Sequence, residues 1–359
     1  MYSFRALLVG LRRLAVLFVP ALVLIVAIGC NRASNLSKEV AYINTPQVVL
    51  RDRLSTIFEK RGTVYLGEKV YVLERKPRFA RVRDLRGEEG WLADRYLIPG
   101  ETYEKFIKLE TENAGTPVQA HGTARSLLNL HIEPGRDTDH LFQLKEGDKL
   151  EVLKRAIAEK PKSLQPAPAL KKTSAGKETE EGQPPAMEDW LLVRGPREKR
   201  VGWALARFVD IDVPLDVAQY AEGQRIMSAV VLRQVQDGDK QVPEYLVMLT
   251  DNKDGLPWDF NQIRVFTWNL KRHRYETAYR ERNLVGVFPV STGTADFGKE
   301  GIEPTFTVRV KDDQGNITER KYRMIGPIVR RIMAPEEQQK EAAERATRRA
   351  AEGGRRRRK

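Results

Sequence analysis

The chain has 359 residues, of which 41% are apolar and 31% charged, a composition typical of water-soluble globular domains rather than polytopic membrane proteins. This length predicts two or three compact units. One cysteine excludes an intramolecular disulfide framework, and four histidines add little from which to build a thiolate zinc site. We therefore expect no metal and no cofactor.

The amino-terminal segment 1–29 is typical of a secretory signal. It begins with basic residues and continues in an apolar run from Leu14 to Gly29. As a helix this run would be about 24 Å long, shorter than the ~30 Å hydrocarbon core of a bilayer, so a lasting membrane span is disfavoured.

The end of that segment, Ala27-Ile28-Gly29-Cys30, resembles the lipobox of bacterial lipoproteins. The resemblance implies that Cys30 carries a diacylglycerol and that the chain is bound to a membrane through this lipid. Asn31 resembles an outer-membrane sorting residue, which implies a cell-envelope protein facing the periplasm. The alternative is that Cys30 is only a small residue at the end of an uncleaved anchor. The polar residues 30–41 are predicted to form a tether.

A tandem repeat follows. Gly67–Leu73 matches Gly147–Leu153 at an offset of 80 (147 − 67), and Gly90–Leu97 matches Gly202–Val209 at 112 (202 − 90). The larger offset indicates an insertion in the second copy, which we place at 159–187. This stretch is rich in proline and has no aromatic residue, so we expect a disordered loop inside one domain.

Short β-branched or aromatic runs separated by glycine turns, each copy ending in Gly-Trp and a second aromatic residue, resemble the bacterial SH3-like (SH3b) family. The resemblance covers 42–98 and 118–211, less the insertion, and implies two small barrels in tandem. It also implies a shallow groove for peptidoglycan stem peptides or other extended peptides. The candidate groove residues are all aromatic: Phe58, Phe79, Tyr96, Trp190 and Phe208. Core packing is the alternative for these rings, and it is favoured for Trp91 and Trp203.

The regions beyond the repeat are predicted from hydropathy patterns. Residues 99–117 and the segment after Pro214 favour short connecting helices. Region 214–334 carries strong strand runs without helical periods between them, so we expect an antiparallel, sandwich-like β domain. The basic tail 335–359 is expected to be helical or disordered. It either contacts anionic groups or acts only as a solubilising end.

No catalytic motif stands out. The sole thiol, Cys30, is expected to be acylated, and the histidines lie in no nucleophile or zinc-peptidase motif. We therefore expect a mainly β, non-catalytic, lipid-anchored envelope protein that binds peptidoglycan or peptides and does not bind nucleic acid. The alternative is a structural subunit of an envelope complex that uses its barrels for protein–protein contacts.

Overall fold

The structure is a computed structural model that describes residues 39–164, 171–172, 178–179, 185–196 and 200–333. It is mainly β, with three seven-stranded antiparallel sheets. The chain divides into two compact units, Met1–Tyr103 and Glu104–Lys359. The predicted signal 1–29 and the tail 335–359 lie outside the described residues. The first strand begins at Glu39 and therefore includes the last residues of the predicted tether.

The first sheet has the strand order β3-β2-β6-β5-β4-β1-β7. A 3-10 turn η1 precedes its last strand, and helix α2 follows it. The bounds are β1 Glu39–Ile43, β2 Gln47–Arg51, β3 Lys60–Tyr65, β4 Lys69–Lys76, β5 Phe79–Arg83, β6 Glu89–Ala93, η1 Asp94–Tyr96, β7 Leu97–Pro99 and α2 Gly100–Glu112.

The first sheet is strongly curved, as the packing of its core residues shows. In a flat sheet the two edge strands would lie about 29 Å apart, at ~4.8 Å per gap. Yet Val64 of edge strand β3 and Leu97 of edge strand β7 pack on the same hydrophobic cluster as Leu50 and Val82. The sheet therefore wraps around its own core. It is not closed, because β3 and β7 are not hydrogen-bonded neighbours among the described strands.

The second sheet repeats this strand order as β10-β9-β15-β14-β11-β8-β16. The bounds are β8 Ala120–Ala124, β9 Leu128–His131, β10 His140–Leu144, β11 Lys149–Glu159, β14 Met187–Arg194, β15 Val201–Leu205, η3 Ala206–Phe208 and β16 Val209–Ile211. Turn contacts repeat as well. The Gly67 amide donates to the Ile43 carbonyl over 2.8 Å, and the Gly147 amide donates to the Ala124 carbonyl over 2.8 Å.

The insertion lies at the end of a long hairpin. Strands β11 and β14 remain paired as far as Glu159 and Met187, so the added residues leave the strand order unchanged. Most of the predicted loop 159–187 lies outside the described residues. The described parts include η2 Lys162–Leu164 and a short pair, β12 Lys171–Lys172 and β13 Glu178–Thr179.

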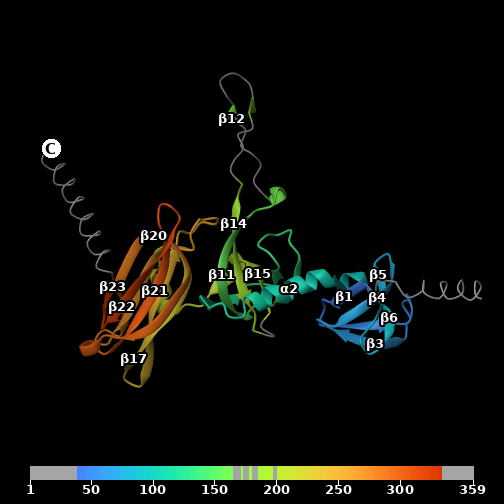
Figure 1. Cartoon of the computed structure of the whole chain (residues 1–359), viewed down its shortest axis with the longest axis horizontal. Helices are drawn as coiled ribbons and strands as arrows, with labels where there is room; N and C mark the ends of the chain where they lie inside the picture. Colours follow the sequence, from blue (N-terminus) through green and yellow to red (C-terminus); the bar gives the residue numbers. More distant parts are fainter. Residues whose placement is uncertain (1–38, 165–170, 173–177, 180–184, 197–199, 334–359) are drawn as a thin grey trace, which may run out of the picture. The chain divides into compact units, whose positions relative to one another are not determined.

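The third sheet is a meander in which neighbouring strands follow chain order from β17 to β23 (Figure 1, yellow to red). The bounds are β17 Arg225–Asp237, β18 Lys240–Thr250, β19 Phe260–Asn269, β20 Arg274–Asp296, β21 Ile302–Lys311, β22 Ile317–Ile325 and β23 Ile328–Ile332, with η5 Gly298–Glu300 before β21. The expected antiparallel pairing is present, but the sandwich is not, because these strands form one sheet rather than two packed layers.

One face of this sheet encloses a core to which all seven strands contribute, from Met227 on β17 to Val329 on β23. The opposite face of the early strands is covered by α3 Leu215–Ala218 and η4 Gln219–Ala221, where Val217 packs on Val247 and Phe266. Strands β18 and β19 are therefore buried on both faces.

Candidate functional site

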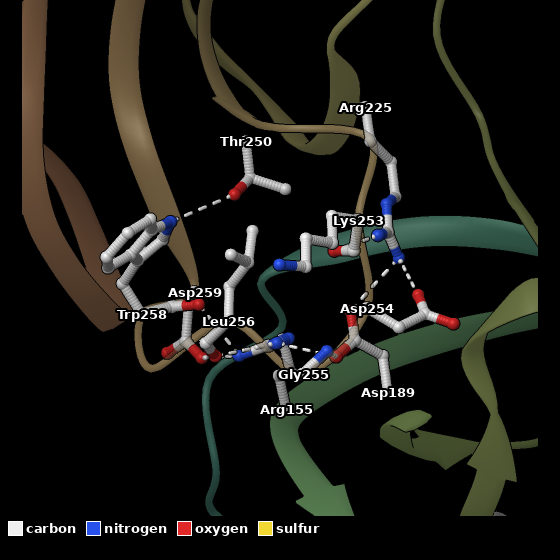
Figure 2. Close-up of polar contacts among 10 residues, drawn as sticks. All are labelled: Arg155, Asp189, Arg225, Thr250, Lys253, Asp254, Gly255, Leu256, Trp258 and Asp259. Carbon is white, nitrogen blue, oxygen red and sulfur yellow. Dashed lines mark hydrogen bonds and ion pairs between the residues drawn. The ribbon is translucent and has the colours of Figure 1, made fainter. Parts of the chain in front are cut away.

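The second and third sheets meet at a network of buried ion pairs, drawn in Figure 2. Arg155 on β11 donates from Nη2 to Asp189 Oδ1 on β14 over 2.6 Å, and both side chains are at most 5% exposed. The same guanidinium donates to two backbone carbonyls of the third sheet's loop, Leu256 over 3.0 Å and Trp258 over 2.7 Å. One arginine thus fixes this loop to the second sheet.

Asp189 is the centre of this network. Its Oδ1 also accepts the Gly255 amide over 2.9 Å, and its Oδ2 accepts Arg225 Nη1 over 3.0 Å. Arg225 extends the chain of contacts to Asp254 over 3.0 Å. A buried carboxylate is tolerated when several donors replace water in this way.

The loop between β18 and β19 can approach strand β14 closely because residue 255 is a glycine. Its φ is +75°, and a Cβ at this position would lie 2.4 Å from the Cβ of Met187, the first residue of β14. Any side chain would therefore push the loop away from the second sheet.

Asp259 and Gln119 also join the two sheets. Asp259, just before β19, has its Oδ1 3.4 Å from Arg155 Nη1, while its Oδ2 accepts the Phe288 amide of its own sheet over 2.7 Å. Burial raises the pKa of this carboxyl. Gln119, at the start of the second sheet, accepts the Val290 amide at Oε1 over 2.7 Å and the Ser228 hydroxyl at its carbonyl. Because Gln119 and Ser228 are buried, the two sheets are joined by polar contacts that water does not reach.

A groove of about 600 Å³ lies beside this network, and its volume is within the range found for ligand-binding sites. We call it the junction groove. Its lining comes from the second sheet, the α3–η4 segment and the third sheet: Arg125, Leu191, Ala206, Arg207, Val209, Asp210, Ile211, Val213, Ala218, Ala221, Gln224, Arg225, Ile226, Met227, Asn252, Lys253 and Asp254.

The charges of the junction groove are only partly neutralised. Arg125 pairs with Asp210, and Arg225 is held by Asp189 and Asp254. By contrast, Arg207 and Lys253 make no ion pair within the part of the chain that the structure describes. The Arg207 guanidinium carbon lies 4.8 Å from the Phe208 ring centroid, a cation–π contact that orients this cation. The groove therefore combines aliphatic lining with two cations that make no ion pair within the described residues.

The five aromatic candidates occupy different environments. Phe58 is 37% exposed in the β2–β3 loop, under the Arg51 guanidinium carbon at 4.3 Å. Phe79 is half-buried on β5. Tyr96 and Phe208 are half-buried at equivalent positions in η1 and η3, and Tyr96 packs against the first core.

Trp190 is only 2% exposed, and its ring meets His131 edge-on at 5.1 Å. This burial favours core packing, the alternative named for these rings, over a place in a ligand groove. Of the five rings, Phe208 lies between two lining residues of the junction groove, Arg207 and Val209, and Trp190 is the neighbour of a third, Leu191. Cys30, the expected lipid attachment site, lies outside the described residues.

Sequence reasoning missed the residues of the network. Arg155 and Asp189 are 34 positions apart, and Asp189 and Arg225 are 36 apart. The one local signal was an aspartate inside an otherwise apolar strand, Asp189-Trp190-Leu191-Leu192-Val193.

Within the described ranges, no group of three or more histidine, cysteine or acidic side chains is placed to hold a metal ion. No helix among those residues combines the length and apolar character needed to cross a bilayer.

No protein-family model and no curated protein matches the chain. Solved structures with some likeness include NlpC2 from Trichomonas vaginalis, with a TM-score of 0.16, 10% identity, and coverage of 70% of this chain and 99% of that one. An NlpC/P60 family protein from Bacillus cereus has a TM-score of 0.19 at 10% identity, covering 66% of this chain and 93% of its own. NlpC1 from Trichomonas vaginalis has a TM-score of 0.16 at 10% identity, covering 68% and 88%. At such TM-scores these likenesses carry neither fold nor activity over to this chain.

Proposed function

We propose that this chain is a non-catalytic, lipid-anchored protein of the cell envelope that binds carboxylate-bearing peptides of peptidoglycan, with its two repeated sheets acting as SH3-like modules. The junction groove is the observation that carries this proposal. Its aliphatic lining suits small side chains such as those of alanine, and its unpaired cations Arg207 and Lys253 suit carboxylates.

Of the two cations, Arg207 is the one whose side chain is already held in place before a ligand binds. Its contact with Phe208 restricts the guanidinium before a ligand arrives, so less rotamer entropy is lost on binding. A planar guanidinium also binds a carboxylate through two parallel hydrogen bonds, which fixes the orientation of an extended peptide.

Acylation of Cys30 would place the groove at the envelope. Two or three acyl chains at this residue would hold the protein on the outer membrane, facing the periplasm, where wall peptides are within reach. The same modification would consume the only thiol of the chain, which supports a binding role rather than thiol catalysis.

Sedimentation with purified sacculi tests this function. The full chain carrying Cys30→Ala should pellet with sacculi in a saturable way. The double variant Arg207→Ala/Lys253→Ala and the single variant Phe208→Ala should lose most of this binding. The matched control is Lys271→Ala/Arg272→Ala, which removes the same charge from an exposed hairpin and should bind as the parent does.

Three other results would contradict the proposal. Absence of pelleting would exclude wall binding, equal loss in the control would indicate charge attraction alone, and release of soluble muropeptides would show an enzyme. Tyr96→Ala measures the contribution of the first sheet in the same assay.

A scaffold subunit is the second candidate. An exposed apolar cluster in the β2–β3 loop favours it, because Leu54, Ile57 and Phe58 are 41%, 85% and 37% exposed. Replacing these three residues with serine should abolish co-purification with envelope proteins if this candidate is right, and should leave the sacculus binding that depends on Arg207 and Lys253 unchanged if the first is right.

A further inference from the structure

Three arginines of the third sheet gather around a single carboxylate. Arg264 Nη2 lies 2.7 Å from Glu222 Oε1, Arg280 Nη2 lies 3.0 Å from the same oxygen, and Arg282 Nη2 lies 3.9 Å from Oε2. Arg264 and Arg280 are directly opposite each other on β19 and β20. Glu222 follows η4 and has a φ of +55°, a left-handed conformation that non-glycine residues seldom adopt.

The charges of this cluster do not balance. Three guanidinium groups face one carboxylate, which leaves a formal surplus of two positive charges (3 − 1). Like charges on directly opposite strand positions repel each other, so this arrangement costs the sheet some stability. Among the described residues no second carboxylate pairs with these arginines.

The buried floor of the cluster has spare hydrogen-bond donors. Arg264 is 1% exposed, and its Nε has no hydrogen-bond partner. Beside it, Gln262 accepts from Arg282 Nε at Oε1 over 2.9 Å, while its Nε2 is also without a partner. The open side consists of Arg280, Arg282 and Glu222, whose side chains are 30%, 57% and 52% exposed. An anion in solution can therefore reach Arg280 and Arg282, behind which Arg264 is buried.

We propose that Arg264, Arg280 and Arg282 form an anion site for a phosphate group, in which Glu222 is an internal occupant that a phosphate displaces or joins. A phosphate carries nearly two negative charges and has three strong acceptor oxygens, which matches the surplus charge. A ligand with one carboxylate does not, because Glu222 already supplies that group from within the chain, at a high effective concentration.

This site shares no residue with the lining of the junction groove, although the groove residues Ala221 and Gln224 lie close to Glu222 in the chain. The recognised chemistry is the phosphate group itself, whether it comes from free phosphate or from a phospholipid headgroup.

Thermal unfolding of the full chain carrying Cys30→Ala tests the proposal. Inorganic phosphate should raise the unfolding temperature by several degrees above sodium chloride of equal ionic strength. Arg280→Ala/Arg282→Ala should remove this difference, whereas Arg272→Ala/Arg274→Ala on the neighbouring hairpin should keep it. Equal effects of the two salts on the parent protein, or a full phosphate effect in the first variant, would overturn the proposal.

Glu222→Gln provides the sharper test. Removing the internal carboxylate should tighten phosphate binding about tenfold, measured by calorimetric titration, because the ligand no longer competes with it. If this variant does not fold, Arg282→Ala should still weaken phosphate binding several-fold, since that side chain is the most exposed of the three. Unchanged affinity in the variant that is measured would contradict the assignment.

Vesicles distinguish the sources of phosphate. Co-sedimentation with phosphatidic acid vesicles that is lost in Arg280→Ala/Arg282→Ala, and absent with phosphatidylcholine alone, identifies a lipid headgroup. Binding of inorganic phosphate without vesicle binding identifies a soluble ligand. Both results support an anion site, and the absence of both refutes it.

Discussion

Asp189 Oδ1 lies 2.6 Å from Arg155 Nη2, an ion pair within the second sheet that is almost completely removed from solvent and whose two side chains also bond a loop of the third sheet. Removing one partner of such a pair leaves an uncompensated buried charge, which typically costs about 3–5 kcal/mol. Asp189→Asn should therefore lower the free energy of unfolding of the full chain by roughly this amount, measured by urea denaturation.

Asp251→Asn is the control for this substitution, because Asp251 is an exposed residue at the start of the same loop. It should change the free energy of unfolding by less than about 0.5 kcal/mol. A loss of similar size in both variants would contradict a specific role for the buried pair.

The two environments of the aromatic candidates predict different costs of truncation. Trp190→Ala removes a ring that is 2% exposed and should destabilise the chain by about 3–5 kcal/mol, through lost burial and the cavity left behind. Phe58→Ala removes a partly exposed loop ring and should cost under about 1 kcal/mol. Chemical denaturation of both variants checks the prediction, and a low cost for Trp190→Ala would place that ring outside the core.

Equivalent glycines in the two repeated sheets predict equivalent defects. A Cβ on Gly90 would lie 2.7 Å from Leu50 Cβ, and one on Gly202 would lie 2.6 Å from Leu130 Cβ. Gly90→Ala and Gly202→Ala should each destabilise their sheet by about 1–3 kcal/mol, because the neighbouring strand must move. Gly115→Ala serves as the comparison, since no atom lies within 4 Å of its added methyl group. If all three variants melt alike, the close packing is not what limits these positions.

Glu188 predicts a loss of stability in acid. Its hydrogen bonds to Arg136, 2.6 and 2.7 Å long, hold the pKa of this carboxyl below its usual range. The carboxylate therefore stabilises the folded state above its unfolded pKa of about 4.3, and this contribution is lost as the pH falls through the lower, folded pKa.

The comparison with Glu188→Gln isolates this contribution. The difference in unfolding free energy between parent and variant should be constant from pH 7 to about pH 5, then shrink toward pH 3. The same comparison in an Arg136→Ala background, which removes the partner supplied by the β9–β10 loop, should show a smaller pH dependence. A difference that grows in acid would reverse the sign of the assigned pKa shift.

Local pattern was sufficient for the strands and the repeat. The runs Tyr245–Leu249, Gln262–Trp268 and Phe306–Val310 lie inside β18, β19 and β21, because alternating or continuous apolar residues with β-branched neighbours favour strands in any context. The offset matches between the two copies correspond to two sheets of identical strand order. In both cases the information lies within a few residues along the chain.

Features set by distant partners were not predictable in this way. The sandwich prediction for region 214–334 is wrong, since seven strands pair in chain order in one sheet and curvature, rather than a second layer, encloses the core. Arg264 illustrates the same limit. Alternation alone places it on an exposed face, but α3 and η4 cover that face and bury it.

The hydrogen bonds of Gln119 determine how the second and third sheets respond to a pulling force. Its side chain and carbonyl bond to Val290 and Ser228 of the third sheet at the point where the chain enters the second. Tension applied from the amino-terminal side, as on a tethered protein under load, therefore reaches both sheets at one residue. In single-molecule stretching, these sheets should rupture together in one force peak rather than in two.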